Sequence, residues 1–124
     1  MDMTPILVVD DQSAMRRIIK NQLKSAGYGS VDEAGSGAAA LARLAEVHYA
    51  LVILDWTMPG MTGIEVLEEI RRRPELQRIK VVMVTAEGLR ENVLKAVQAG
   101  ANNYVVKPFS PAALIERINE TLGG

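Results

Sequence analysis

The chain has 124 residues, a length that suits one domain with a single buried core and leaves no room for a second. Its net charge of -1, with 48% hydrophobic and 23% charged residues, is typical of a soluble globular protein and argues against a broad nucleic-acid or membrane-binding surface. With no cysteine and one histidine, disulfides, thiolate catalysis and a histidine metal cluster are excluded.

No apolar run approaches the length of a membrane span, and the first residues lack the basic and then apolar pattern of a signal peptide. Together with the lack of cysteine, this favours the cytoplasm. We therefore expect one cytoplasmic, monomeric domain over residues 1–124.

Apolar runs of strand length alternate with segments whose apolar residues recur at helical spacing, which is the pattern of a parallel sheet with helices on both faces. Strands are expected at residues 6–11, 30–34, 50–55, 80–85 and 103–106. The second of these alternates polar and apolar residues, whereas the others are continuously apolar. It should therefore be a half-exposed edge strand.

Helix ends carry recognisable residues. Ser13 is expected to cap the first helix, Thr62 and Glu65 have the spacing of a capping box, and Ser110 precedes Pro111 at the first position of the last helix. Helices are expected at residues 13–26, 37–47, 62–70, around 93–100 and 111–122. The fold class is a doubly wound (βα)5 fold.

Two helix surfaces carry groups of similar side chains outside the strand ends. Arginines 71–73 close the third helix and are interpreted as a solvated end, where cations suit the helix dipole. The fourth helix carries Val93, Leu94 and Val97 on one face and ends at Gly100.

Right-handed crossovers with strand order 2-1-3-4-5, as in flavodoxin-like folds, place the first and third strands side by side where the winding reverses. The first apolar run closes on Asp10 and Asp11, the third on Asp55, the fourth on Thr85 and the fifth on Lys107. These five residues should share the carboxyl edge of the sheet.

Crowded carboxylates repel one another and gain from a cation that bridges them, and Mg²⁺ prefers such oxygen ligands. A carboxylate can also attack phosphorus when a metal offsets the charge, and Asp55 lies centrally for that role. Lys107 and Thr85 can then hold other phosphoryl oxygens.

Four segments also carry a resemblance: VVDDQSAMRRII, LDWTMPGMTG, VTAEG and YVVKPF. Through them the chain resembles the receiver domains of response regulators over nearly its whole length. Among receivers it is most similar to single-domain chemotaxis regulators of the CheY type, especially in DDQSAMRRII, in Trp56 and over residues 90–110.

The resemblance implies a set of metal and phosphoryl contacts. Asp55 is the implied phospho-acceptor, and Asp11, Asp55 and the Thr57 carbonyl are implied as direct Mg²⁺ ligands, with Asp10 acting through water. It implies that Thr85 and Lys107 hold the phosphoryl group, and that the bond before the proline after Lys107 is cis.

The resemblance further implies a switch. Tyr104 would turn inward when Thr85 is drawn to the phosphoryl group, changing the surface of the fourth helix, fifth strand and fifth helix. Implied partners are a histidine kinase as donor and a downstream protein, favoured to be the flagellar motor switch. Candidate contacts on that surface are Arg90, Lys95, Tyr104 and Arg117.

Two positions depart from the family's usual pattern. Thr57 stands where chemotaxis members often carry Asn, and Thr62 where the family usually has Asp. Thr57 lies near the path of attacking water, so the lifetime of the phosphorylated state does not carry over. Thr62 is interpreted as a helix cap.

Other readings stay open. Asp10 or Asp11 alone is more often a helix cap than a ligand. The chain can also be a phosphorelay intermediate, a kinase-regulating receiver or a binding module with idle acids. An aspartate-nucleophile phosphotransferase would need Asp-x-Asp after the first strand, and a flavodoxin-type carrier a Ser/Thr/Gly phosphate loop there. Under the favoured interpretation the protein is not an enzyme that acts on other substrates. It catalyses only its own phosphorylation and dephosphorylation.

Overall fold

The computed structural model of the chain describes residues 1–86 and 90–123, which form one sheet and its helices. The strands are β1 (Ile6–Val9), β2 (Val31–Ala34), β3 (Leu51–Asp55), β4 (Lys80–Thr85) and β5 (Asn103–Val106). The helices are α1 (Ser13–Ser25), α2 (Gly37–Glu46), α3 (Gly63–Arg72), the short 3-10 helix η1 (Pro74–Leu76), α4 (Arg90–Ala99) and α5 (Pro111–Gly123).

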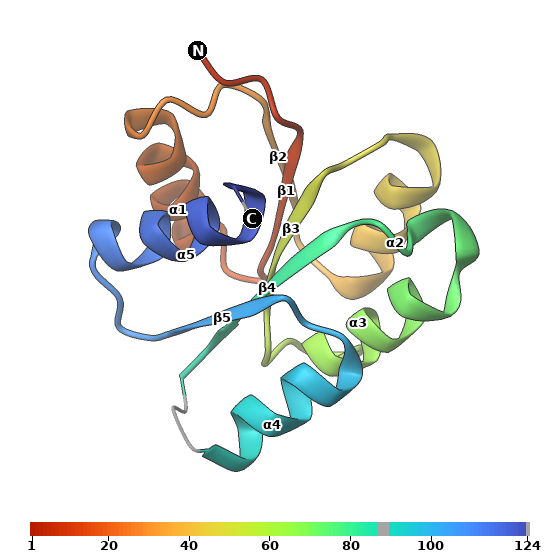
Figure 1. Cartoon of the computed structure of the whole chain (residues 1–124). Helices are drawn as coiled ribbons and strands as arrows, with labels where there is room; N and C mark the ends of the chain where they lie inside the picture. The colour runs from red at the N-terminus through yellow and green to blue at the C-terminus, as the bar shows by residue number, and fades with distance from the viewer. Residues whose placement is uncertain (87–89, 124) are drawn as a thin grey trace.

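All strand pairs are parallel, and the sheet order is β2-β1-β3-β4-β5. This confirms the predicted order, with β1 and β3 adjacent. Helices α1 and α5 lie on one side of the sheet, and α2, α3 and α4 on the other (Figure 1). The carboxyl ends of β1 and β3 therefore meet at the point where the direction of winding changes.

Strands β1, β3 and β4 are buried on both faces because successive side chains point to opposite sides of a sheet, whereas β5, at the second edge, is mostly half-buried. In β1, Leu7 and Val9 join the core beneath α2, α3 and α4, whereas Ile6 and Val8 join the core beneath α1 and α5. Strand β2 has a half-buried Asp32 and an exposed Glu33 at the edge of the sheet. The predicted edge strand is thus confirmed.

The predicted caps of α3 and α5 are confirmed. Thr62 and Glu65 form a reciprocal capping box, and the Ser110 hydroxyl accepts a hydrogen bond from the Ala113 N–H at 3.1 Å. The predicted cap of α1 is wrong. Ser13 is the first residue of that helix, and Gln12 occupies the cap position without a side-chain bond. The Gln12 N–H, just before the helix, donates to Asp10 Oδ1 at 2.9 Å.

Helix α4 is unusual in what it buries. Ala96 is its one fully buried hydrophobic side chain in the described part of the helix, while Leu94 and Val97 are 49% and 58% exposed. Its large apolar residues therefore face outward, and small side chains lie against the sheet.

Within the described residues, no helix is long and apolar enough to cross a membrane.

Candidate functional site

Three carboxylates come together at the carboxyl edge of the sheet. Asp10 and Asp11 follow β1, and Asp55 is the last residue of β3, which pairs with β1. One oxygen from each lies within 4.8 Å of the others. Asp10 and Asp55 are buried, with 1% and 6% of their surface exposed, whereas Asp11 is exposed. Two of the three charges thus stand in a poorly solvated position.

Lys107 supplies the cation of this site. Its Nζ donates a hydrogen bond to Asp55 Oδ1 at 3.1 Å and lies 3.7 Å from Asp10 Oδ2. Its backbone N–H donates to the carbonyl oxygen of Thr85 at 2.7 Å, which ties the end of β5 to the end of β4. The peptide bond between Lys107 and Pro108 is cis, as the resemblance implied. Thr85 itself is buried, 4% exposed.

Burial raises the pKa of Asp55 above its ordinary value. The hydrogen bond from Lys107 lowers that pKa, and the charge of Asp10 raises it again. The ionised form of Asp55 is therefore disfavoured by its surroundings and stabilised by any added positive charge.

The site opens to solvent through a hollow of about 480 Å³, which we call the acid cleft. Its lining residues are Asp11, Gln12, Asp55, Thr57, Met58, Pro59, Ala86 and Lys107. The structure thus brings the predicted Asp11, Asp55, Thr57 and Lys107 to one cavity, with Asp10 beside it. Thr85, at the end of β4, is buried and does not line it.

Sequence reasoning assigned no role to Gln12, Pro59 or Ala86, which also line the acid cleft. Each lies within two residues of a predicted site residue, so proximity in sequence was the available indication. The segment VTAEG continues past Ala86 into Glu87 and Gly88, which lie outside the described residues.

The acid cleft fits a hard cation. Asp10 Oδ2 is buried and accepts no hydrogen bond from any described group, so its lone pairs remain available to a ligand. Three carboxylates face a single ammonium group, and all the offered ligand atoms are oxygens. Such a donor set can hold a divalent ion of the magnesium type.

The residues predicted for partner binding lie on α4, β5 and α5. Arg117 of α5 has its guanidinium carbon 5.8 Å from the centre of the Tyr104 ring, and Tyr104 is half-buried. Lys95 is exposed on α4, and the side chain of Arg90 lies outside the described part of the structure. The predicted surface contacts Arg117 and Tyr104 are therefore neighbours.

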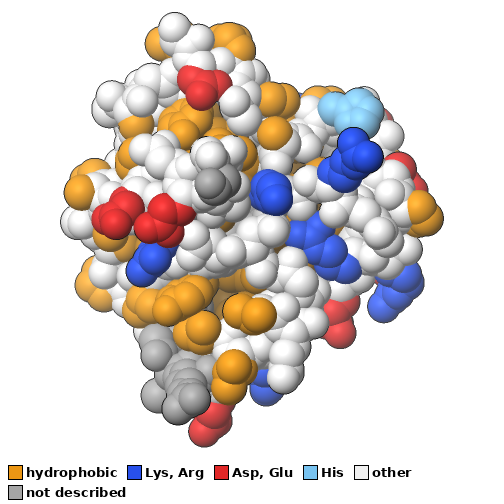
Figure 2. All heavy atoms as spheres, viewed as in Figure 1, with side chains coloured by type: hydrophobic (Ala, Val, Ile, Leu, Met, Phe, Trp, Pro, Cys, Tyr) orange, Lys and Arg blue, Asp and Glu red, His pale blue; other side chains and the backbone are white. Residues whose placement is uncertain are grey.

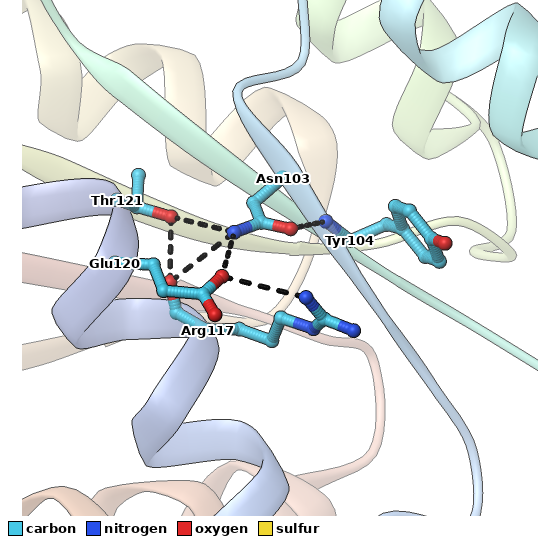
Figure 3. Close-up of polar contacts among 5 residues, drawn as sticks. All are labelled: Asn103, Tyr104, Arg117, Glu120 and Thr121. Carbon is cyan, nitrogen blue, oxygen red and sulfur yellow. Dashed lines mark hydrogen bonds and ion pairs between the residues drawn. The ribbon is translucent and has the colours of Figure 1, made fainter. Parts of the chain in front are cut away.

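A hydrogen-bond network from β5 to α5 holds this pair in place (Figure 3). The Asn103 amide nitrogen donates to Thr121 Oγ1 at 3.2 Å and to Glu120 Oε2 at 3.3 Å. The same Glu120 oxygen accepts from Arg117 Nη1 at 3.4 Å. Arg117 is thus oriented by the network that binds β5 to α5.

The fold and site define a response regulator receiver domain, and the family model with that description matches residues 6–119. The chain belongs to this family.

Three known proteins illustrate the similarity. The chemotaxis protein CheY-3 of Vibrio cholerae is 47% identical over 93% of this chain and 88% of its own length. The structure of CheY4, another chemotaxis protein of that organism, superposes with a TM-score of 0.90 at 31% identity, covering 96% of this chain and 98% of the other.

The third is the receiver domain of a sensor histidine kinase from Pseudomonas aeruginosa, solved with a magnesium ion coordinated in its active-site cleft. It has a TM-score of 0.88 and 28% identity, and the match covers 98% of this chain and 99% of that one.

Proposed function

We propose that this protein is a phospho-accepting switch of a two-component system, in which Asp55 takes a phosphoryl group from a histidine kinase. The observation that carries the proposal is the contact of Lys107 Nζ with Asp55 Oδ1 at 3.1 Å, inside a cluster of three carboxylates. The proposal is supported because a carboxylate able to attack phosphorus lies beside a cation and two further carboxylates that could ligate a metal.

The chemistry proceeds by displacement at phosphorus. An Asp55 oxygen forms a new bond to phosphorus while the bond between phosphorus and the donor histidine nitrogen breaks, and the freed imidazole takes up a proton. Mg²⁺, held by Asp11, Asp55 and the Thr57 carbonyl with Asp10 acting through water, would offset the charge that builds up between the anionic reactants. Lys107 and Thr85 bind phosphoryl oxygens and orient the group for transfer.

The Mg²⁺ part of the proposal is supported by the unbonded Asp10 oxygen and the all-oxygen ligand set. The related histidine-kinase receiver, solved with magnesium in its cleft, adds support by similarity.

We infer that the output surface is formed by α4, β5 and α5, with Lys95, Tyr104, Arg117 and Arg90 as contacts, and that Tyr104 moves inward with Thr85. Exposed Leu94 and Val97 give this surface an apolar component. Similarity to two chemotaxis proteins favours a chemotactic role, with the flagellar motor switch as target.

The remaining features of the proposal follow the same interpretation: one receiver domain over residues 1–124, acting as a monomer in the cytoplasm. The main alternative is a phosphorelay intermediate or kinase regulator, which similarity to the receiver of a sensor histidine kinase favours. The two differ in target and share the same chemistry at Asp55.

The test uses acetyl phosphate with Mg²⁺ and intact-protein mass spectrometry. The wild type should gain one phosphoryl group, and Asp55→Asn should gain none. Lys107→Ala should react more slowly, because it loses the cation that orients the phosphoryl group. Label that persists in Asp55→Asn would show that the acceptor is another residue.

A further inference from the structure

Basic side chains gather at the end of the sheet opposite the acid cleft. Arg71 of α3, Arg78, and Lys80 at the start of β4 line a hollow of about 540 Å³. A second hollow of about 560 Å³ shares Arg78 and Lys80 and extends to His48. Figure 2 shows lysine and arginine side chains beside the pale blue histidine on this side of the molecule. We call the two hollows together the basic groove.

The cations of the basic groove have no carboxylate partners among the described residues. Elsewhere in the described structure, ion pairs neutralise Arg16, Lys20, Arg43, Arg72, Arg73, Lys107 and Arg117. The described cations outside these pairs are Arg17, Lys24, Lys95 and the three that line the groove. Unpaired positive charge is therefore concentrated at one place on a protein whose net charge is -1.

Arg71 shows that this charge is partly desolvated. Its Nε donates to the Gly100 carbonyl at 3.0 Å, its Nη1 to the Ile79 carbonyl at 2.8 Å, and its Nη2 to Asn102 Oδ1 at 2.9 Å. Burial lowers the pKa of its guanidinium. Because only neutral oxygens contact it, its charge is offset by dipoles alone, and a carboxylate nearby would be favourable.

The same hydrogen bonds make the wall of the groove rigid. Arg71 joins α3 to the residue before β4, to the end of α4 and to the residue before β5. Asn102 Oδ1 also accepts the Val81 N–H at 2.8 Å. A ligand would thus meet a preformed surface and would not have to order it.

The shape favours an extended ligand. Cationic groups stand along the hollows at Arg71, Arg78 and Lys80, the second hollow continues to His48, and Glu75 is the one acid among their lining residues. The floor between them includes Ile79 and Tyr49, which are 8% and 4% exposed. A compact anion at Arg78 and Lys80 would reach only the part that the two hollows share, whereas a chain with spaced carboxylates and an apolar side chain would also reach Arg71 and the apolar floor.

We propose that the basic groove binds an acidic peptide segment of a partner protein, with its carboxylates at Arg71, Arg78 and Lys80 and an apolar residue against Ile79. The groove lies at the opposite end of the strands from Asp55, so binding there leaves the acid cleft open. The proposal is independent of phosphorylation and of the function proposed above.

The test is fluorescence anisotropy with a short fluorescein-labelled peptide of alternating glutamate and leucine. The dissociation constant of the peptide should rise about tenfold or more in the double variant Arg78→Glu with Lys80→Glu, because two attractive charges become repulsive. The matched control is Arg17→Glu with Lys24→Glu, which reverses two exposed, unpaired cations on α1 and changes the net charge equally. The control should bind within about twofold of the wild type.

Urea unfolding of both double variants establishes that they are folded. The variant Asp55→Asn should bind the peptide as the wild type does, because position 55 lies at the other end of the strands. Equal loss of affinity in the control would overturn the proposal, since attraction would then follow net charge alone. It would also be overturned if pyrophosphate displaced the labelled peptide at lower concentration than the unlabelled peptide does, because the groove would then select a compact anion.

Discussion

Gly63, the first residue of α3, lies directly against the carbonyl oxygen of Asp55. A Cβ atom at position 63 would overlap that oxygen and would stand 2.8 Å from the Cα atom of Trp56. The Gly63 N–H donates to the Trp56 carbonyl at 2.8 Å, so the chain after Asp55 folds back on itself. The close approach fixes the loop that carries Thr57.

From this contact we expect Gly63→Ala to lower the free energy of unfolding by about 2 kcal/mol or more, because backbone atoms must move to admit the methyl group. Gly123→Ala is the matched control, since nothing lies within 4 Å of a Cβ at that position of α5. Urea unfolding of both variants measures the difference. Equal effects at the two positions would contradict the close contact.

A second prediction concerns Asp55 and pH. Its folded pKa lies above the ordinary value of 3.8, so the folded state holds the proton more tightly than the unfolded chain does. The metal-free protein should therefore lose stability as pH rises from about 4 through the raised pKa. Asp55→Asn removes this dependence and should be more stable than the wild type at pH 7, by about 1 kcal/mol.

Urea unfolding in EDTA at several pH values measures this difference, which should vanish below about pH 3, where Asp55 is mostly protonated in both the folded and the unfolded chain. A variant less stable than the wild type at pH 7 would contradict the prediction. It would mean that the hydrogen bond of Asp55 with Lys107 stabilises the fold by more than the burial of the carboxylate destabilises it.

A third prediction concerns metal binding. Mg²⁺ should raise the free energy of unfolding of the wild type, by about 2.7 kcal/mol at one hundred times its dissociation constant. Trp56, the only tryptophan, adjoins Asp55 and is half-buried, so its emission should change with the same midpoint. Asp11→Ala should remove both responses.

Glu68→Ala is the control for metal binding, since it removes an exposed acid of α3 outside the acid cleft. It should respond to Mg²⁺ as the wild type does. A response of Asp11→Ala as large as that of the wild type would mean that Asp11 is not a ligand.

A fourth prediction concerns Arg71. Arg71→Met keeps the aliphatic part of the side chain and leaves the Gly100 and Ile79 carbonyls without their donor, so it should cost about 2 kcal/mol. Arg72→Met is the control, because the Arg72 side chain is 71% exposed and pairs only with Glu69. Hydrogen exchange should also become faster in α4 of the first variant, whose last turn loses its anchor. Similar unfolding curves for the two variants would argue against this role.

The sequence predicted the sheet and the residues that meet at its carboxyl edge, because both follow from short-range pattern. A continuously apolar run implies a buried parallel strand, and the residue that ends it, such as Asp55 or Thr85, must lie at the carboxyl edge of the sheet. The strand order then determines which strand ends are neighbours. Asp10 and Asp55 could be placed together without any knowledge of side-chain packing.

What failed depends on contacts between distant segments. Arg71 was predicted to be solvated, yet its carbonyl partners belong to residues 79 and 100, which only the folded chain brings to it. The sequence placed Leu94 and Val97 on one face of the fourth helix without saying whether that face is buried. The structure turns both side chains outward and buries Ala96, a choice that helical spacing does not determine. The cap of α1 was wrong by one position, because the helix begins at Ser13 itself and Gln12 takes the cap position.

The pairing of Lys107 with both Asp10 and Asp55 has a consequence for charge balance. Three ionised carboxylates and one ammonium group leave two negative charges uncompensated, which is the charge that one divalent cation neutralises. A monovalent ion would leave the centre anionic, and a trivalent ion would make it cationic. Electroneutrality therefore selects ions by valence at this position, before coordination geometry distinguishes among the divalent metals.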